Sequence, residues 1–298
     1  MIGGKTMNQL KGVHHITAIT SSAEKIYDFF TYTLGMRLVK KTVNQDDINT
    51  YHLFFADDKG NPGTDMTFFD FPGVPKGTHG TNEIYRTSFR VPSDAALKYW
   101  VERFDKLQVS HNGIQEQFGK KIVSFIDFDD QQYQLISDEN NKGVKSGIPW
   151  KKGPIPLEYA ITGLGPIYIR IKEWDYLKTL FENVFQFNEI AQEDRLHLFE
   201  FGEGGNGAQV IVEENSELPY ASQGYGTVHH AAFRVNDRLD LDDWDQHLKR
   251  VGLRTSGFVD RFYFGSLYCP VAPQLLFEIA TDGPGFMGDE PYETLGEK

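Results

Sequence analysis

Ala232-Phe233-Arg234-Val235, near the C-terminus, has two near-copies earlier in the chain, Ser88-Phe89-Arg90-Val91 and Tyr168-Ile169-Arg170-Ile171. Each copy alternates small or polar with apolar side chains, a pattern typical of a β-strand. A stretch with aromatic residues at helical spacing follows each copy within about a dozen residues. Because the same order of elements returns at a regular interval, the chain is predicted to be built from one repeated unit.

Each unit predicts one leading strand, one helix and a group of shorter strands. Residues 15–20 form a fourth and more divergent copy of the leading strand. The helical patterns cover residues 26–34, 96–104, 176–184 and 241–251. Strands divided by turn signals follow at residues 51–55 and 66–69, 122–126 and 133–136, 196–201 and 208–212, and 262–264 and 275–279. The pattern predicts an α+β protein of four βαβββ modules, each about 60 residues long.

Modules of this kind must pair, because one module cannot close a sheet or cover both of its faces. Paired modules form a half-open barrel around a cavity. We expect residues 8–140 to hold an N-terminal pair of modules along the chain and residues 161–286 a C-terminal pair, while the repeats leave open which module shares a barrel with which. A polar, Gly- and Pro-containing linker is predicted at residues 141–160, and an irregular tail from Asp282.

Composition restricts the classes of function. The net charge of −12, from 30 basic and 42 acidic residues, argues against nucleic acid or an anionic membrane as a partner. The single cysteine, Cys269, excludes an internal disulfide framework, and no apolar run has the length of a membrane span. A content of 14% aromatic residues suits an apolar pocket. We expect a cytoplasmic protein that binds a small molecule, with self-association left open.

Two His-His pairs stand in strand segments at opposite ends of the chain, His14-His15 and His229-His230. Neighbouring side chains of a strand point to opposite faces, so one member of each pair is the better candidate to face a cavity. In the second pair this is His230, which shares the more polar face, and in the first pair His15 is favoured more weakly. His230 stands four residues before a repeated arginine. The middle copies have Arg86 and Pro166 there, so we expect one site and not two.

A lone carboxylate, Glu278, lies in an apolar strand near the C-terminus. Its burial would be costly unless a cation compensates its charge. It aligns with Gln134 in the second module, and we take Asp70 as its counterpart in the first. Two imidazoles and one carboxylate are the ligand set that holds non-haem Fe(II), and Mn(II) accepts similar ligands. We therefore predict a metal site at His15, His230 and Glu278; the alternative is two pairs of core histidines and a surface glutamate.

Other motifs carry less weight. Residues 202–207 fit the glycine pattern of a dinucleotide-binding loop, but a strand follows where that motif requires a helix, so a hairpin loop is expected. His52 stands in an aromatic strand and is expected to be packed or hydrogen-bonded and not a metal ligand. Arg261 and Tyr268 precede Glu278 in a strand-turn region and are expected to project toward the same cavity.

The fourfold unit resembles the vicinal-oxygen-chelate (glyoxalase/extradiol dioxygenase) superfamily, and within it the hydroquinone ring-cleaving dioxygenases. The stretches that carry the resemblance are residues 13–17, 51–57, 63–69, 228–233 and 276–281. The likeness extends from about Leu10 to Phe286. It implies an Fe(II)-dependent enzyme that uses O2 to open the ring of a small hydroquinone- or catechol-type aromatic.

The resemblance also implies roles for individual residues. The Fe(II) ligands fall on His15, His230 and Glu278, the same three residues that the repeats select. Further catalytic positions fall on His14, Thr17, His229, Arg261 and Tyr268. In this assignment His229 and Tyr268 act as acid, base or hydrogen-bonding groups, and Arg261 stabilises negative charge. Strict alternation turns His14 and His229 away from the metal, so a bulge would have to bring them near.

Two other functions fit the same scaffold. One is a redox-neutral isomerase or thiol transferase that uses Ni, Mn or Zn. A fourth metal ligand, such as Asp70, would favour this function. The other is a non-catalytic protein that binds aromatic compounds in the same pocket.

Overall fold

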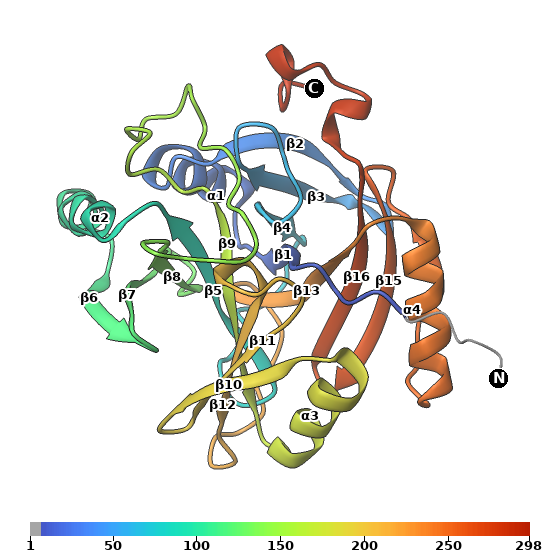
Figure 1. Cartoon of the computed structure of the whole chain (residues 1–298). Helices are drawn as coiled ribbons and strands as arrows, with labels where there is room; N and C mark the ends of the chain where they lie inside the picture. The colour runs from blue at the N-terminus through green and yellow to red at the C-terminus, as the bar shows by residue number, and fades with distance from the viewer. Residues whose placement is uncertain (1–6) are drawn as a thin grey trace.

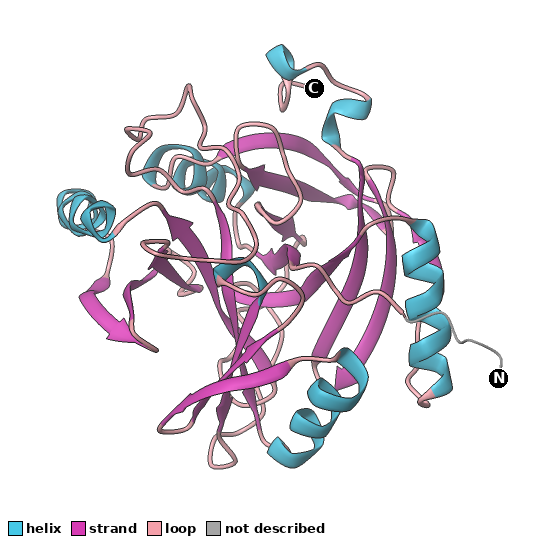
Figure 2. Ribbon diagram, viewed as in Figure 1, coloured by secondary structure: helices cyan, strands magenta, loops and turns pink. Residues whose placement is uncertain are grey.

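The computed structural model describes residues 7–298, and its strands form two eight-stranded sheets with the helices at their outer sides (Figures 1 and 2). Four βαβββ modules follow one another along the chain, as predicted. The first contains β1 (Val13–Ile19), α1 (Ala23–Asp28) with a π-helical turn (Phe29–Thr33), β2 (Arg37–Asn44), β3 (Asp47–Ala56) and β4 (Asp65–Asp70). The second contains β5 (Glu83–Val91), α2 (Asp94–Leu107), β6 (His111–Gln117), β7 (Lys120–Ile126) and β8 (Gln132–Ser137).

The third and fourth modules repeat this order. The third contains β9 (Gly163–Ile171), α3 (Trp174–Leu180) with a π-helical turn (Phe181–Phe185), β10 (Asn188–Glu193), β11 (Leu196–Glu200) and β12 (Gln209–Glu214). The fourth contains β13 (Thr227–Val235), α4 (Arg238–Arg250), β14 (Phe258–Asp260), β15 (Phe264–Ala272) and β16 (Leu275–Pro284). A strand follows the glycine-rich loop at residues 202–207, as the sequence indicates.

The modules pair across the chain. The first sheet has the order β14-β15-β16-β13-β1-β4-β3-β2 and joins the first module to the fourth. The second sheet has the order β10-β11-β12-β9-β5-β8-β7-β6 and joins the second module to the third. At the centre of each sheet two leading strands pair antiparallel, β1 with β13 and β5 with β9. This pairing is what brings the two ends of the chain together.

The segment between β8 and β9, residues 138–162, contains no helix or strand. The division of the chain at residues 141–160 into two halves stays a prediction. The tail begins later than expected, because β16 continues through Asp282 to Pro284. Two 3-10 turns, Phe286–Gly288 and Tyr292–Thr294, then follow.

The strand expected at residues 262–264 begins at Phe264 and continues to Ala272 as β15. Four other strands were not predicted from the sequence, β2, β6, β10 and β14. Each is the last strand at an edge of its sheet. An edge strand covers less of the core and carries mixed polar side chains, as the largely exposed residues of β10 illustrate. The alternation that reveals a half-buried strand is therefore weak in them.

Helix α2 illustrates how the helices attach to the sheets. Ser93 begins it, since its Oγ accepts a hydrogen bond from the backbone N–H of Ala96. Its buried side chains, Ala96, Leu97, Trp100 and Phe104, recur at helical spacing and form one stripe. Burying each large apolar side chain contributes about 1.5–3 kcal/mol. The stripe is thus what fixes the helix on its sheet.

One apolar core connects the two sheets. Phe30, in the π-helical turn after α1, contacts Phe55 and Phe68 of the first sheet with ring centroids 5.0 Å apart in both cases. The same ring lies 5.9 Å from Phe89 and 5.8 Å from Tyr133 of the second sheet. The sheets are therefore held in one unit by shared aromatic packing.

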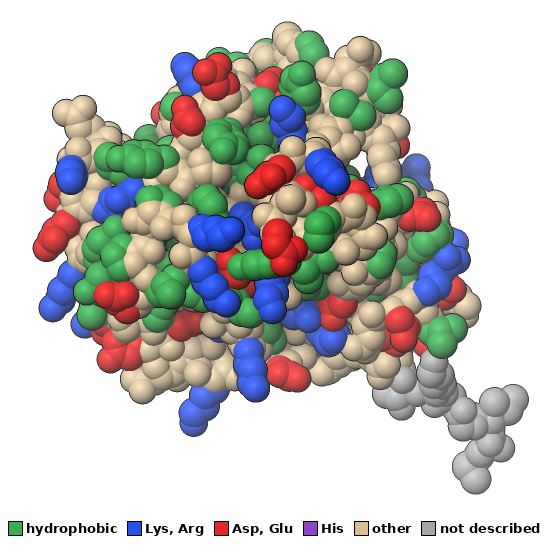
Figure 3. Space-filling model, turned by 90° about the horizontal axis from the view of Figure 1, so that it is seen from above, with side chains coloured by type: hydrophobic (Ala, Val, Ile, Leu, Met, Phe, Trp, Pro, Cys, Tyr) green, Lys and Arg blue, Asp and Glu red, His purple; other side chains and the backbone are tan. Residues whose placement is uncertain are grey.

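The outer surface shows both signs of charge, with basic and acidic side chains interspersed on the face drawn in Figure 3. None of the helices within residues 7–298 combines the length and apolar character that a membrane span needs.

Candidate metal centre

A β-bulge on β1 changes the direction of the first histidine pair. Val13 is paired with Phe233 of β13, and His15 is paired with the next residue, Ala232. His14 is therefore an extra residue with no partner in the register. A bulge breaks the strict alternation of side chains.

The partner strand has the same feature. Thr17 is paired with His230, and Ala18 is paired with Val228, so His229 is the extra residue on β13. The expectation that strict alternation turns His229 away from the site is wrong for this reason, and both His229 and His230 line one cavity. The two histidine pairs thus lie on adjacent strands in related bulges.

Three side chains meet at this point. His15 Nε2 lies 3.0 Å from Glu278 Oε2, and His230 Nε2 lies 2.9 Å from the same oxygen. The exposed fractions of His15, His230 and Glu278 are 3%, 4% and 0%. One ligand atom from each residue lies within 4.8 Å of the others. The structure therefore brings together the three residues that the sequence selected.

Hydrogen bonds fix the tautomer of His15. His14 Nε2 lies 3.0 Å from the backbone carbonyl of Thr281, which can only accept, so this nitrogen carries a proton. Burial, with His15 alongside, lowers the pKa of His14 to about 3, so the imidazole is neutral and its Nδ1 is an acceptor. That atom lies 2.8 Å from His15 Nδ1, which must donate. With that proton on Nδ1, His15 Nε2 is the ring atom that could bind a metal, and it lies 3.0 Å from Glu278 Oε2.

The second pair repeats the contact. His229 Nδ1 and His230 Nδ1 are 2.8 Å apart. Burial, with His230 alongside, lowers the pKa of His229 to about 3, so His229 is also neutral. A metal on His230 Nε2 requires the proton of that ring on Nδ1, where His229 accepts it. His229 then presents an Nε2–H group toward the cavity.

The donor set fits a divalent cation. Glu278 Oε1 accepts a hydrogen bond of 2.5 Å from Ser266 Oγ, whereas the buried Oε2 has no hydrogen bond from any residue in 7–298. Burial alone would raise the pKa of Glu278, but His15 and His230 hold it well below its usual range. One buried carboxylate oxygen and two imidazole nitrogens thus converge, and this is a donor set that a divalent metal ion fits.

Asp70 is not the counterpart of Glu278, contrary to the sequence alignment. Glu278 pairs in register with Ala232, two residues beyond His230. The equivalent partner of Thr17, two residues beyond His15, is Thr67.

Asp70 instead accepts a hydrogen bond from the backbone N–H of Ala23 at the start of α1. Gln134 is correctly aligned, since it pairs with Ser88 two residues beyond Arg86. A threonine thus occupies the place of a fourth ligand.

A cavity of about 560 Å³ opens in front of the three residues. Aromatic and aliphatic side chains form much of its wall: Val43, Phe54, Phe69, Phe71, Phe262, Tyr263, Phe264 and Leu276. Thr17, His52, His229, Arg261 and Tyr268 add polar groups to the lining. The volume and the apolar wall suit a small aromatic molecule.

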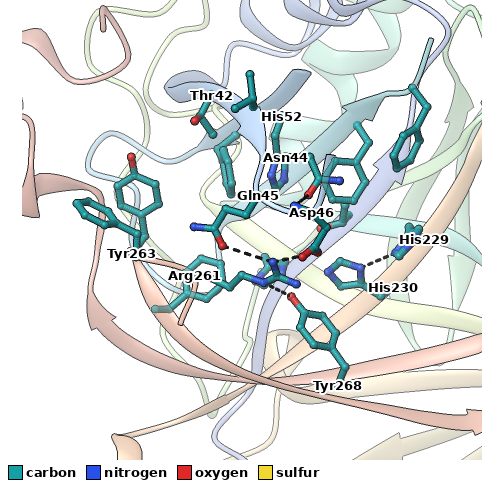
Figure 4. A pocket seen from close by; sticks show the side chains of 18 of the residues that line it. Thr42, Asn44, Gln45, Asp46, His52, His229, His230, Arg261, Tyr263 and Tyr268 are labelled. Carbon is teal, nitrogen blue, oxygen red and sulfur yellow. Dashed lines mark hydrogen bonds and ion pairs between the residues drawn. The ribbon is translucent and has the colours of Figure 1, made fainter. Parts of the chain in front are cut away.

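Two of the predicted residues form a hydrogen-bonded pair at the cavity (Figure 4). Arg261 Nε donates to the Tyr268 hydroxyl at 2.9 Å, and its Nη1 lies 3.1 Å from Asp46 Oδ2. Burial raises the pKa of Tyr268, so its hydroxyl keeps its proton at neutral pH. Because that oxygen accepts from Arg261, its own proton is available to a bound molecule.

The remaining predicted residues divide into two groups. Thr17 and His229 line the cavity, whereas His14 lies behind His15, between it and Thr281. His52 is packed and hydrogen-bonded, as expected, but it also lines the cavity, and its hydrogen bond to Thr67 escaped the sequence patterns. Counting two residues beyond His15 and crossing to the next strand would have identified Thr67.

Known proteins resemble this chain over almost its whole length. A family model described as the Glyoxalase/Bleomycin resistance protein/Dioxygenase superfamily matches residues 12–136. The "Putative ring-cleaving dioxygenase MhqA" of Bacillus subtilis is 41% identical over 97% of this chain and 92% of its own length. The "Chlorohydroquinone/hydroquinone 1,2-dioxygenase" of Sphingobium indicum is 30% identical over 97% of this chain and 91% of its own length.

Solved structures agree. The crystal structure of a "putative dioxygenase" from Bacillus subtilis superposes with a TM-score of 0.89 at 34% identity, covering 98% of this chain and 91% of that one. Glyoxalase I from Zea mays superposes with a TM-score of 0.64 at 13% identity, covering 91% of this chain and 92% of that one. The second likeness concerns the fold alone.

Proposed function

The chain belongs to the glyoxalase/bleomycin resistance protein/dioxygenase superfamily, and from this premise we propose that it is a ring-cleaving dioxygenase that acts with O2 on a hydroquinone- or catechol-type aromatic. The observation that carries the proposal is the convergence of two buried imidazoles and one buried carboxylate at the floor of an aromatic cavity. The names of the full-length relatives support the reaction class.

His15, His230 and Glu278 would hold the metal, with Fe(II) as the proposed ion and Mn(II) as a second ion that such ligands accept. Held by these three ligands, Fe(II) would supply the redox chemistry that lets a phenolic ring react with O2. The protein's own part is to bind and orient the ring. A para-hydroquinone cannot bring both oxygens to one ion, so polar side chains must hold the second hydroxyl.

The polar groups around the cavity can do this. His229 presents Nε2–H and Tyr268 presents its hydroxyl proton, so both can donate to oxygen atoms of the substrate. Arg261 keeps a positive charge beside Tyr268 and stabilises negative charge that develops on oxygen. His14 acts through His15, since it fixes the proton of that ring on Nδ1. The aromatic wall gives these polar groups an apolar surrounding.

The redox-neutral isomerase is the second candidate. It would be favoured by a fourth protein ligand, and Thr67 stands at the position where the repeats place one. Within residues 7–298 the three-residue group is the one set of His, Cys, Asp and Glu side chains close enough to share an ion. The ligand count therefore favours the dioxygenase.

The test is anaerobic loading with Fe(II), followed by measurement of O2 uptake with hydroquinone, methyl- and chloro-substituted hydroquinones, and catechol. We expect uptake that depends on one of these compounds, with a ring-opened product in the absorption spectrum. Protein that carries Fe(II) and consumes no O2 with any of them would refute the proposal. Isomerase assays on the same protein loaded with Ni(II) or Zn(II) would then decide the second candidate.

A further inference from the structure

His52 occupies a place with a counterpart in the fourth module. On β3, His52 is paired with Phe69, two residues beyond Thr67, and its Nε2 lies 3.0 Å from Thr67 Oγ1. On β15, Ser266 is paired with Ala280, two residues beyond Glu278, and its Oγ donates to Glu278 Oε1. His52 and Ser266 therefore occupy equivalent strand positions. His52 contacts Thr67, and Ser266 contacts the proposed metal ligand Glu278.

The hydrogen bonds continue from His52 to the floor of the cavity. Thr67 Oγ1 lies 2.8 Å from Thr17 Oγ1, and the exposed fractions of these residues are 0% and 1%. Thr17 is paired in register with His230, and both line the cavity. His52 lines the same cavity, where Figure 4 shows it together with His230. A chain of three polar groups therefore runs through the sheet from one part of the cavity to another.

The direction of the protons in this chain follows from His52. Its ring is held between Phe54 and Phe69, with centroids 4.0 Å and 4.4 Å away, so it cannot turn freely. Burial, together with His15 and His230 nearby, lowers its pKa well below the usual value, so it carries one proton. Of its two nitrogens, Nε2 contacts Thr67 Oγ1, and Nδ1 has no hydrogen bond to any residue in 7–298.

Both directions of the chain satisfy the two hydrogen bonds inside the sheet, and the direction adopted here has the proton on His52 Nε2. In that state His52 donates to Thr67, Thr67 donates to Thr17, and the hydroxyl proton of Thr17 points into the cavity. In the reverse direction Thr17 would present only lone pairs, and the proton on Nδ1 would be without a protein acceptor.

Building on the dioxygenase function proposed above, we propose that His52 and Thr67 are positioning residues that make Thr17 a hydrogen-bond donor to the reacting oxygen atoms. Thr17 contacts the substrate directly, while the other two set the direction of its hydroxyl. A donor whose direction is fixed before the reaction stabilises negative charge on oxygen without further rearrangement.

The tautomer of His52 tests the direction of the chain in metal-free protein. Long-range 1H–15N NMR of protein labelled with 15N-histidine separates the two tautomers, and a His52→Phe variant assigns the signal. We expect Nε2–H. A proton on Nδ1 would overturn the proposal.

A second test removes the middle hydroxyl. Thr67→Val keeps the shape of the side chain, and Thr67→Ser keeps the hydroxyl. With Fe(II)-loaded protein and an active hydroquinone, we expect Thr67→Val to lower kcat about tenfold or more, the effect of losing one hydrogen bond to a charged group. KM and bound metal should stay within about twofold of wild type, and Thr67→Ser should recover most of kcat.

Thr87→Val is the matched control, because Thr87 is a buried threonine of the second sheet whose hydroxyl has no hydrogen-bond partner among residues 7–298. It should keep the activity of wild type. Wild-type kcat in Thr67→Val, or equal losses in the Val and Ser variants, would overturn the proposal. Failure of the dioxygenase function would show itself differently, as wild-type protein without O2 uptake, and the NMR test would still decide the direction of the chain.

Discussion

The two sheets have the same strand order, yet they place opposite chemistry at equivalent positions. In the first sheet His15 and Glu278 share a site that calls for a cation. In the second sheet the position of His15 is taken by Arg86, which lies over the rings of Tyr85 and Tyr168. The position of Glu278 is taken by Ile211, and it is paired with Tyr168.

In the second sheet the positive charge is therefore that of Arg86, and β12 has Ile211 in place of a carboxylate at the position of Glu278. The small cavity of the second sheet, of about 20 Å³, is lined by Pro166, Tyr168 and Ile211 among others. Even the bulge is shared, because Tyr85 is the extra residue before Arg86, as His14 is before His15. The backbone therefore forms equivalent positions in both sheets, and the side chains alone decide which of these positions can hold a metal.

The largest expected effect comes from removing the carboxylate in the first sheet. Glu278→Gln should lose bound metal and lower O2 uptake by more than about 100-fold, since even residues that only support a ligand cost 10–100-fold. The matched control is Gln134→Leu at an equivalent strand position of the second sheet. Metal analysis and O2 uptake on both variants check the prediction. Equal loss of metal in the two variants would contradict the assignment of the metal site to the first sheet.

His229 should affect the reaction and leave the metal in place. His229 is proposed to donate a hydrogen bond to the substrate, so His229→Phe should lower kcat by about 100-fold, the lower range for loss of a proton donor. Bound metal should remain near wild type, because the side chain is not one of the three proposed ligands. Loss of metal in proportion to activity would show that His229 acts only through His230.

Metal should stabilise the folded chain through the first sheet alone. At a free metal concentration 100 times Kd, binding contributes about 2.7 kcal/mol, which raises Tm by roughly 5–10 °C in a domain of this size. Thermal unfolding under argon, with and without Fe(II) or Mn(II), measures this. Glu278→Gln should show little change on addition of metal, and a rise like that of wild type would place the ion elsewhere.

The smallest effect concerns a buried acid at the end of β7. Burial raises the pKa of Asp127 to about 7, although Tyr133 and the backbone N–H of Asp129 donate to it. A folded-state pKa above the unfolded value of 3.8 means that the folded chain binds the extra proton. Its stabilising contribution is complete below pH 3.8 and is lost as the pH rises through about 7.

Asp127→Asn removes this dependence. The difference in Tm between the variant and wild type should therefore shift in favour of the variant by about 2 °C or more between pH 5 and pH 8. Thermal melts at the two values check it. An equal difference at both would mean that Asp127 is ionised in the folded protein throughout this range.

The sequence predicted the repeat and the three converging side chains because both depend on regular spacing. His230 and the repeated arginines could be aligned by counting residues, and Glu278 is unusual as a charge in an apolar strand. The direction of His229 could not be predicted, because a bulge depends on the pairing of two strands far apart in the chain. Asp70 was misassigned because its charge was given more weight than the register, which places Thr67 opposite Thr17.

The pairing of the first module with the fourth was also beyond the sequence alone. All four modules have the same pattern, so the repeats do not say which two form a sheet. The expected sharing of one site by His15 and Glu278 required it, and the strand order agrees.

The most direct test is anomalous diffraction at the iron edge from crystals grown and loaded with Fe(II) without oxygen. We predict one ion per chain, about 2.0–2.2 Å from Nε2 of His15, Nε2 of His230 and a carboxylate oxygen of Glu278, distances usual for nitrogen and oxygen ligands of divalent metals. An ion bound at other residues, or none at this position, would contradict the proposed metal centre.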